Sequence, residues 1–346
     1  MSRSIEKHSK VRSRMVAAAL TDLIRESDSV LVMGHRMSDL DSVGAALGVL
    51  RICHIYDVPA AVAIRKNATL APQLIRRFED AGLGDSFIDP ELAREAVTEK
   101  TLLIVVDTCL AHMLESRELY QQCSRVAVID HHRRAVGAIE NAAVWYQETY
   151  ASSACELVSE LLQYAGEKGD KPTQLEAEAL LAGIMLDTRN FSLHTGVRTF
   201  EAAAYLRRMG ADTVEVKKLF YNSLESYQQK ARLIASAIIY KRCAIAAETE
   251  PGLRPTDLRI VASQAADERL NIVSVDASFV LYPDGSGVAF SARSMGAVNV
   301  QLVMERLGGG GHLTMAGAQL QNVSMEEAKN RLYEALDWYE QNQRNS

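Results

Sequence analysis

The most informative stretch of this chain is an apolar run that ends in three polar residues, Arg125-Val126-Ala127-Val128-Ile129-Asp130-His131-His132. Its apolar part predicts a strand buried on both faces, as found in parallel sheets that are covered by helices. A carboxylate and two imidazoles follow directly, so the C-terminal end of the strand delivers three polar side chains to one place. We therefore expect a functional site at this end of the sheet.

Three further apolar runs of the same character precede this strand, at residues 29–33, 60–64 and 102–106. The first leads into a polar loop and then into a helix opening rich in small residues, and the third ends at Asp107. The repeated order of strand, polar loop and helix predicts an α/β domain with a mainly parallel sheet flanked by helices. Further helices are expected over residues 5–26, 151–164, 174–186 and 199–209.

The C-terminal part changes to short strands, which predicts a smaller α+β domain. We expect strands at residues 242–247, 259–262, 275–282 and 287–293, a helix over 299–307, and a last helix opened by the capping box from Ser324 to Glu327. The expected division is a first domain at residues 1–205, a helical linker at 206–240 and a second domain at 241–346.

Length, charge and composition argue against some classes of function. A chain of 346 residues is long enough for two domains, and its net charge of −6 argues against a basic track for long nucleic acid. The five cysteines show no Cys-x-x-Cys spacing and are interpreted as buried small hydrophobes in a reducing cytoplasm. No apolar segment reaches the roughly 18 residues that suggest a membrane span, so we expect a soluble, cytosolic chain.

Candidate metal ligands follow the predicted strand and helix ends. Carboxylates mixed with imidazoles, without thiolate, suit Mn²⁺ or Mg²⁺ better than structural zinc. The set exceeds what one ion needs, and with one bridging carboxylate it fits two ions about 3.5–4 Å apart, an arrangement used in phosphoester hydrolysis. Alone, Asp41 or Asp107 could be only a helix N-cap. The candidate ligands are His35, Asp39, Asp41, Asp107, His131 and Asp187.

Five motifs, in this order, resemble those of the DHH/DHHA1 phosphoesterases. They are Gly34-His-Arg-Met-Ser-Asp-Leu-Asp41, Val106-Asp107-Thr108, Ile129-Asp130-His131-His132, Leu186-Asp187-Thr188 and Gly308-Gly309-Gly310-Gly311-His312. The chain is most similar to the catalytic portion of the GdpP-type cyclic-di-AMP phosphodiesterases, through the stretches 6–14, 150–156, 183–191 and 198–200. Ser38 departs from the family, which usually has Pro there, and should alter the stiffness of the loop rather than remove a ligand.

The resemblance implies a role for each motif residue. His35 and Asp39 would hold one metal, Asp41, His131 and Asp187 would hold the other, and Asp107 would bridge them. His132 would face the substrate, where it contacts the scissile phosphate or assists proton transfer. The catalytic residues would thus be His132 and Asp107.

The second domain is expected to hold the substrate. Glycines let backbone N–H groups approach a phosphate without interference from Cβ, and an arginine can bind it in bidentate fashion. On local grounds alone, the glycines could be a helix C-terminus and Arg293 a solvated strand end. The candidate substrate-binding residues, besides His132, are Arg293, Ser294, Gly309, Gly310, Gly311 and His312.

We expect a phosphodiesterase with two Mn²⁺ ions (Mg²⁺ or another divalent ion is possible) that hydrolyses cyclic-di-AMP to linear pApA by a metal-activated hydroxide. The alternative is a nano-RNase or pAp phosphatase acting on short oligonucleotides with the same centre. A non-catalytic nucleotide-sensing module would be expected to have lost a metal ligand. The expected partners are a cyclic dinucleotide and a second copy of the chain in a homodimer.

Full-length GdpP-type members carry membrane helices, a PAS-like sensor and a degenerate GGDEF domain. The resemblance therefore leaves two expectations open. The chain is either an excised catalytic fragment of a protein at the cytoplasmic face of the membrane, or a naturally short cytoplasmic homologue.

Overall fold

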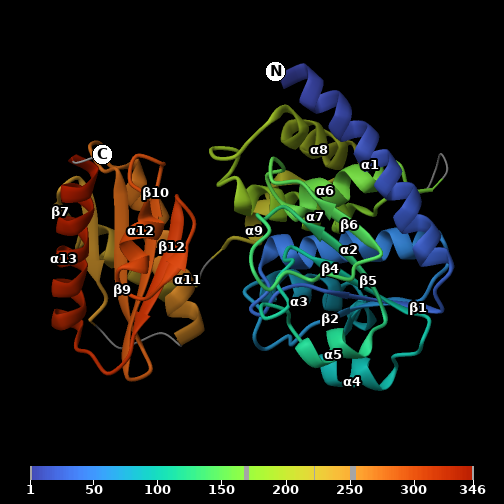
Figure 1. Cartoon of the computed structure of the whole chain (residues 1–346), viewed down its shortest axis with the longest axis horizontal. Coiled ribbons are helices and arrows are strands. Elements are labelled where there is room, and N and C mark those ends of the chain that lie inside the picture. Colours follow the sequence, from blue (N-terminus) through green and yellow to red (C-terminus); the bar gives the residue numbers. More distant parts are fainter. Residues whose placement is uncertain (1, 167–170, 222, 250–254, 345–346) are drawn as a thin grey trace. The chain divides into compact units, whose positions relative to one another are not determined.

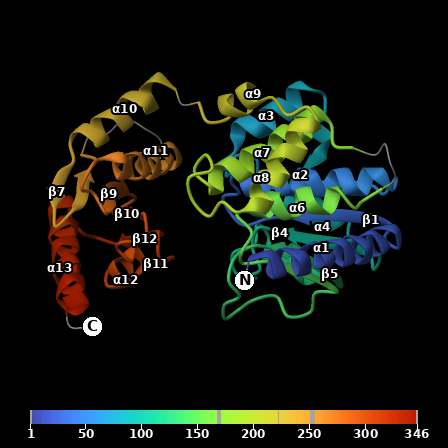
Figure 2. The same cartoon turned by 90° about the horizontal axis from the view of Figure 1, so that it is seen from above.

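In a computed structural model the chain forms two compact units, Met1–Tyr221 and Asn222–Ser346. The structure describes residues 2–166, 171–221, 223–249 and 255–344. Each unit is built on its own six-stranded sheet with helices on both faces (Figures 1 and 2).

The sheet of unit 1 is parallel throughout, in the order β3-β2-β1-β4-β5-β6. The strand order reverses between β1 and β4, and in sheets of this kind ligands bind in the crevice outside the carboxyl ends of the strands at that point. The strands are β1 (Ser29–Met33), β2 (Ala60–Ala63), β3 (Phe87–Ile88), β4 (Thr101–Val106), β5 (Arg125–Asp130) and β6 (Val144–Gln147).

Helices cover both faces because alternate residues of the central strands point to opposite sides. Val30 and Val32 face a large core completed by α1, α2, α3, α6, α7, α8 and α9, whereas Leu31 and Met33 face a smaller core closed by α4 and α5. The helices of unit 1 are α1 (Ser2–Arg25), α2 (Leu40–Ile55), α3 (Pro72–Asp80), η1 (Gly84–Ser86), α4 (Pro90–Glu95), α5 (Arg117–Gln122), α6 (Ala154–Leu162), α7 (Gln174–Asp187), α8 (Val197–Arg208) and α9 (Thr213–Lys218).

Helices α2 and α7 pack so closely that glycine is required where they meet. A Cβ added to Gly44 would lie 2.5 Å from the carbonyl oxygen of Ala179, and one added to Gly183 would lie 2.8 Å from the Cα of Asp41. The first turn of α2 therefore lies directly against the second half of α7, which ends at Asp187.

Unit 2 has a mixed sheet in the order β11-β12-β10-β9-β8-β7, in which only the pair β8 and β9 is parallel. One face packs on α12 and α13, and the other packs on α10 and α11. Its elements are α10 (Leu224–Ala235), β7 (Ile238–Tyr240), β8 (Cys243–Ala247), α11 (Pro255–Glu268), η2 (Arg269–Asn271), β9 (Ala277–Asp284), β10 (Gly287–Ser294), α12 (Val300–Glu305), β11 (Gly310–Gly311), β12 (Met315–Leu320) and α13 (Met325–Arg344).

The predicted fold class is confirmed, with a parallel sheet in the first unit and a mixed sheet with helices in the second. One predicted strand is wrong: residues 259–262 belong to α11. Leu258, Val261, Ala262 and Ala265 are all buried against the sheet, and this spacing is that of one helix face. The short strands β3 and β6 and the helices α3, α4 and α5 were not predicted.

The predicted helical linker, residues 206–240, is not one continuous helix. Gly210, with φ of 99°, follows the end of α8, and Asp212 and Ser223 each cap a new helix by accepting a backbone N–H bond. Helix α9 packs on α7 within unit 1, whereas α10 packs on α11 within unit 2. Most of this segment is thus part of one unit or the other.

Candidate metal centre

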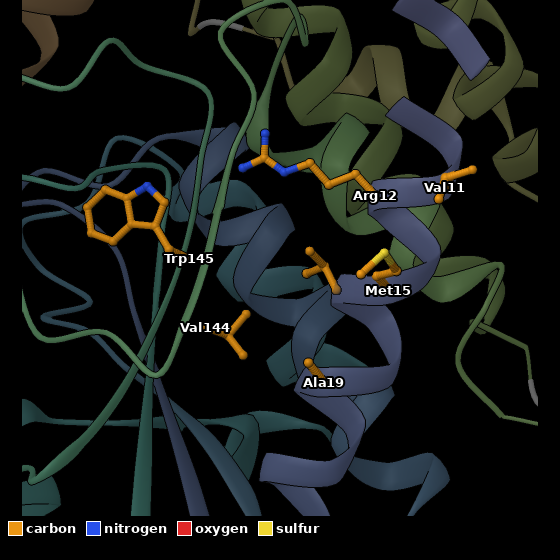
Figure 3. Close-up of a pocket in the computed structure, with 7 residues that line it drawn as sticks. Val11, Arg12, Met15, Ala19, Val144 and Trp145 are labelled. Atoms are coloured by element: carbon orange, nitrogen blue, oxygen red, sulfur yellow. The ribbon is translucent and has the colours of Figure 1, made fainter. Parts of the chain in front are cut away.

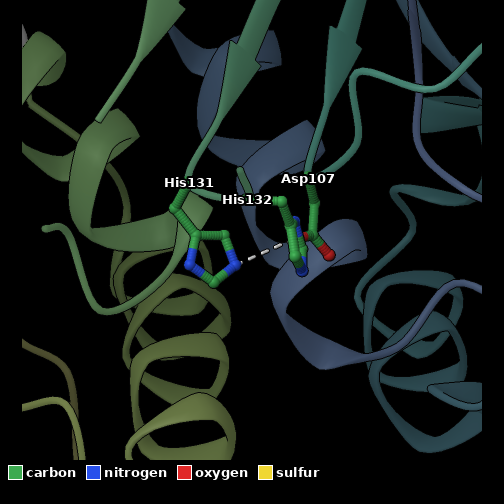
Figure 4. Close-up of side chains that lie close together, drawn as sticks. All are labelled: Asp107, His131 and His132. Carbon is green, nitrogen blue, oxygen red and sulfur yellow. Dashed lines mark ion pairs between the residues drawn. The ribbon is translucent and has the colours of Figure 1, made fainter. Parts of the chain in front are cut away.

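The six predicted metal ligands converge at the carboxyl edge of the unit 1 sheet. His35 follows β1, Asp107 follows β4 and His131 follows β5, and these are the strands around the reversal of strand order. The start of α2 and the end of α7 add the remaining carboxylates, Asp39, Asp41 and Asp187. Figure 4 shows Asp107 beside the two neighbouring imidazoles.

These side chains form overlapping groups in which the possible ligand atoms lie within 4.8 Å of one another. One group is His35, Asp39 and Asp107, and another is Asp41, His131 and Asp187. A third group joins Asp107 to both imidazoles of the His131-His132 pair. Asp107 therefore lies within reach of both sets, as a bridging carboxylate would.

In the first group, the side chains are held by their own backbone surroundings. His35 points Nε2 at Asp107 Oδ2, 3.2 Å away, while its Nδ1 lies 2.8 Å from the carbonyl oxygen of Arg36. That carbonyl can only accept, so Nδ1 carries the proton and Nε2 is left to bind a metal. Asp39 caps α2, with Oδ1 accepting from the N–H groups of Asp41 and Ser42, which leaves Oδ2 available.

In the second group, Asp41 is anchored by the N-terminus of α6. Its two oxygens accept from the N–H groups of Ala154 at 2.7 Å and Cys155 at 2.9 Å. The positive end of the helix favours this fully buried carboxylate. His131 Nε2 lies 3.2 Å from Asp187 Oδ2 and 3.9 Å from Asp41 Oδ2.

Asp107 combines burial with an unusual backbone. It is 3% exposed, has a φ of 59°, and donates its N–H to the carbonyl of Ile129 in β5. Left-handed geometry is costly for a residue with a side chain and is most common at functional positions. Asp107 Oδ1 and His131 Nε2 lie 3.4 Å apart, yet neither makes a hydrogen bond of ordinary geometry among the described residues. Such buried polar atoms fit a donor set completed by a cation.

The second histidine of the pair is oriented differently from the first. His132 Nδ1 lies 2.8 Å from Asp130 Oδ1, which also accepts the His132 backbone N–H. Asp130 is fully buried, whereas the His132 side chain is 41% exposed. From the sequence, Asp130 was grouped with the two imidazoles at the strand end but was given no role; its place two residues before His132 was the available signal.

In this cluster, burial and the neighbouring charges shift the pKa values in opposite directions for some groups and in the same direction for others. Burial alone would lower the pKa of His35, but Asp107 raises it to about 10. Burial also favours a neutral Asp107, but His131 and His35 hold the pKa of that carboxyl well below its usual range. Burial, together with the charge of Asp107, raises the pKa of Asp39 to about 6 and that of Asp41 well above its usual value. A divalent cation among these carboxylates would relieve the repulsion.

The glycine run of unit 2 is shaped mainly by packing. Gly309 and Gly311 lie against β12, where an added Cβ would strike backbone atoms of Gly317 or Ala316. Gly310 is different, because a Cβ there would meet nothing within 4 Å. His312 is exposed and donates its backbone N–H to Met315. A Cβ at Gly308 would also meet nothing, but its φ of 76° favours glycine, whereas neither packing nor a positive φ explains the glycine at position 310.

Arg293 and Ser294 are both engaged within unit 2. Arg293 is 8% exposed, its Nε lies 3.1 Å from Asp267 Oδ1, and it donates to the hydroxyl of Ser263. Ser294 is fully buried and its hydroxyl donates to the carbonyl of Val298. Arg293 is therefore not the solvated strand end that its local sequence allowed.

A surface hollow lies elsewhere on unit 1, between α1 and the edge strand β6 (Figure 3). Its lining includes Val11, Met15 and Trp145 and none of the candidate metal ligands.

Two family models match the chain, one within each unit. Residues 29–184 match the DHH family, N-terminal domain, and residues 237–342 match the DHHA1 domain. The chain belongs to the DHH/DHHA1 superfamily of phosphoesterases.

Two relatives of known activity are similar to this chain over most of its length. The cyclic-di-AMP phosphodiesterase GdpP of Geobacillus thermodenitrificans is 45% identical over 342 residues, covering 97% of this chain and 51% of the relative. The bifunctional oligoribonuclease and PAP phosphatase NrnA of Mycoplasma genitalium is 26% identical over 322 residues, covering 86% of this chain and 91% of that one. The chain spans about half the length of the phosphodiesterases that it matches.

Among solved structures, an exopolyphosphatase-related protein from Bacteroides fragilis has the same fold. The TM-score is 0.80 at 21% identity, and the match covers 94% of this chain and 96% of the other. Within the described ranges of our chain, no helix has the length and apolarity that crossing a bilayer requires.

Proposed function

We propose that this chain is a metal-dependent phosphodiesterase that hydrolyses cyclic-di-AMP to linear pApA. The observation that carries the proposal is the pair of ligand groups that both lie within reach of Asp107, since such a pair suits the hydrolysis of phosphoesters. The choice of substrate is supported by the 45% identical relative that is named for this activity.

The proposed metal assignment follows the two groups. His35 and Asp39 would hold one ion, Asp41, His131 and Asp187 the other, and Asp107 would bridge them. Oxygen ligands outnumber nitrogen ligands in this set, and we propose two Mn²⁺ ions, with Mg²⁺ as the nearest substitute. When bound, such ions polarise a phosphoryl oxygen and lower the pKa of a water molecule.

The proposal assigns the side chain of His132 to the substrate rather than to the metals. Asp130 holds Nδ1, so Nε2 is left for a phosphate oxygen or for the leaving oxygen. In the reaction a water oxygen bonds to phosphorus, the bond from phosphorus to the 3′ oxygen breaks, and that oxygen takes up a proton. His132 Nε2 is the proposed donor of that proton or, alternatively, a hydrogen-bond donor to the scissile phosphate.

The proposed substrate contacts in unit 2 differ in their support. Gly310 is the strongest candidate, because the space that a Cβ would fill there is open. Gly309 and Gly311 would act indirectly, by keeping this strand close to β12, and Ser294 by shaping the loop that precedes α12. Contact of Arg293 or His312 with phosphate remains part of the proposal.

We also propose a homodimer located in the cytoplasm, to be tested by sedimentation and by fractionation.

The test is a product assay with Mn²⁺ in which cyclic-di-AMP, pApA, cyclic-di-GMP and pAp are supplied at equal concentrations. Cleavage of cyclic-di-AMP that stops at pApA is the expected result. Rapid release of AMP from pApA or pAp, with the cyclic compound untouched, would replace the proposal with the oligoribonuclease and phosphatase activity for which the 26% identical relative is named.

A further inference from the structure

Two phenylalanines of unit 1 form an exposed aromatic stack close in sequence to a metal-ligand candidate. The rings of Phe191 and Phe200 are nearly parallel, 17° apart, with centroids 5.6 Å from one another. Phe191 is half-buried against the large core, whereas Phe200, on α8, is 56% exposed. The inner ring thus supports an outer ring that keeps more than half of its surface open.

The inner ring is tied to Asp187 by a short and constrained segment. Thr188 is fully buried; its hydroxyl accepts the N–H of Phe191, and its carbonyl accepts those of Ser192 and Leu193. Arg189, Asn190 and Phe191 are three consecutive residues with positive φ, at 46°, 54° and 63°. Left-handed backbone geometry at three consecutive residues with side chains is energetically unfavourable. Such a segment persists only where the surrounding structure holds it.

The neighbours of the outer ring, Phe200, are bound to the helix that holds Asp41. Arg198 binds Glu160 through two contacts of 2.6 and 2.5 Å, and the Thr199 hydroxyl donates to Glu156. Both glutamates belong to α6, whose first N–H groups hold Asp41. The stack is therefore linked to α6, whose N-terminus hydrogen-bonds Asp41, and to the end of α7, which carries Asp187.

We propose that Phe200, backed by Phe191, is a stacking surface for an adenine base of the substrate. This inference rests on the proposed function and extends it to recognition of the base. Phe191 lies four residues from Asp187, so their Cα atoms are at most about 15 Å apart, and the hydrogen-bonded turn shortens that distance. On this proposal, a nucleotide whose phosphate lies at the metal group places its base on the face of Phe200. Aromatic rings stack on bases regardless of base identity, which makes Phe200 a contact to purines rather than a selector of adenine.

The test distinguishes stacking on a base from packing within the protein. It removes or enlarges the aromatic ring at position 200 and keeps the side chain apolar. Phe200→Leu removes the aromatic face, and Phe200→Trp restores and enlarges it. Tyr227→Leu, an exposed aromatic position on α10, is the matched control. Two substrates are used with Mn²⁺: cyclic-di-AMP, which carries bases, and bis(p-nitrophenyl) phosphate, which carries none.

Phe200→Leu is expected to raise KM for cyclic-di-AMP about 5- to 100-fold, the range that corresponds to loss of one stacked base. Turnover of bis(p-nitrophenyl) phosphate should stay at the wild-type level, and Phe200→Trp should recover the wild-type KM. An equal loss on both substrates would show that Phe200 only supports the fold, and an unchanged KM for cyclic-di-AMP would also overturn the proposal.

A binding measurement distinguishes failure of this proposal from failure of the proposed function. Calorimetry with Mn²⁺ compares AMP with ribose 5-phosphate, which lacks the base, on wild type and Phe200→Leu. Tighter binding of AMP that disappears in the variant supports the stacking surface even if cyclic-di-AMP is not hydrolysed. Equal binding of the two compounds by the wild type overturns it, whatever the substrate is.

Discussion

Asp130 and His132 lie two residues apart and are joined by a contact of 2.8 Å between a carboxylate oxygen and Nδ1. The neighbouring His131 instead points Nε2 at Asp187, 3.2 Å away. The two imidazoles that follow this strand thus point to different carboxylates. The difference is set by the buried carboxylate that precedes them, because it fixes one ring and leaves the other to the cluster.

Asp130→Asn tests this division. The amide keeps the shape and an acceptor oxygen but removes the charge that supports His132. We expect kcat to fall about 10- to 100-fold, as is usual when an orienting partner is changed, while two metal ions per chain are retained. Metal content by elemental analysis, measured beside kcat, checks the result. Loss of metal would show that Asp130 supports the cluster as a whole.

Asp107→Asn tests the bridge. The amide has one acceptor oxygen and no charge, so it cannot join the two groups, and activity should drop by several orders of magnitude with less than two ions bound per chain. The control is Asp85→Asn, which changes an exposed carboxylate in η1. Near wild-type turnover of Asp107→Asn would remove Asp107 from the role of bridge.

Gly310→Ala and Gly309→Ala form a matched pair in unit 2. The methyl group at Gly310 enters open space, so the fold should be unaffected while KM rises about 10- to 100-fold if the backbone there binds a phosphate. The methyl group at Gly309 strikes β12 and should lower the free energy of unfolding by about 1–3 kcal/mol. Thermal denaturation and KM are measured for both. An unchanged KM for Gly310→Ala would exclude a backbone contact at this glycine.

The cysteines predict a pH dependence. All five are buried and free, and burial raises the pKa of Cys53 and of Cys243 to about 12. Because the unfolded thiols ionise near pH 9, this contribution to stability is fully present below that pH and is lost as pH rises toward 12, at about 1.4 kcal/mol per pH unit for each thiol. Unfolding by denaturant at pH 7.5 and 10 measures the loss. Native thiols should react slowly with Ellman's reagent at pH 8, and a rapid reaction of several thiols would contradict their burial.

Much of unit 1 was predictable because its central strands are continuous apolar runs that end in polar residues. The strands containing Val32, Val105 and Val128 were found for this reason. Strand β6 was missed because it lies at the sheet edge and is only four residues long, with alternating burial. Strand β3, with two residues, carries no periodic signal at all.

The surroundings of Arg293 could not be predicted from local pattern. Its partner Asp267 lies 26 residues earlier in the chain, on a helix that was interpreted as a strand around Arg259 to Ala262. An apolar run of three residues does not distinguish strand from helix, and the wider spacing from Leu258 to Ala265 was needed. In the metal cluster, by contrast, the candidate ligands follow from strand and helix ends, and the structure places them together.

The crossing of α2 and α7 has a consequence for ion selectivity. Since a Cβ at Gly183 would lie 2.8 Å from the Cα of Asp41, the close spacing of the helices that carry Asp41 and Asp187 depends on the missing side chain of this glycine. One methyl group at position 183 would spread the helices and enlarge the coordination sphere, which would favour larger ions such as Ca²⁺ over Mg²⁺. In the proposed centre, the size of the ion would thus depend on Gly183, which is not itself a candidate ligand.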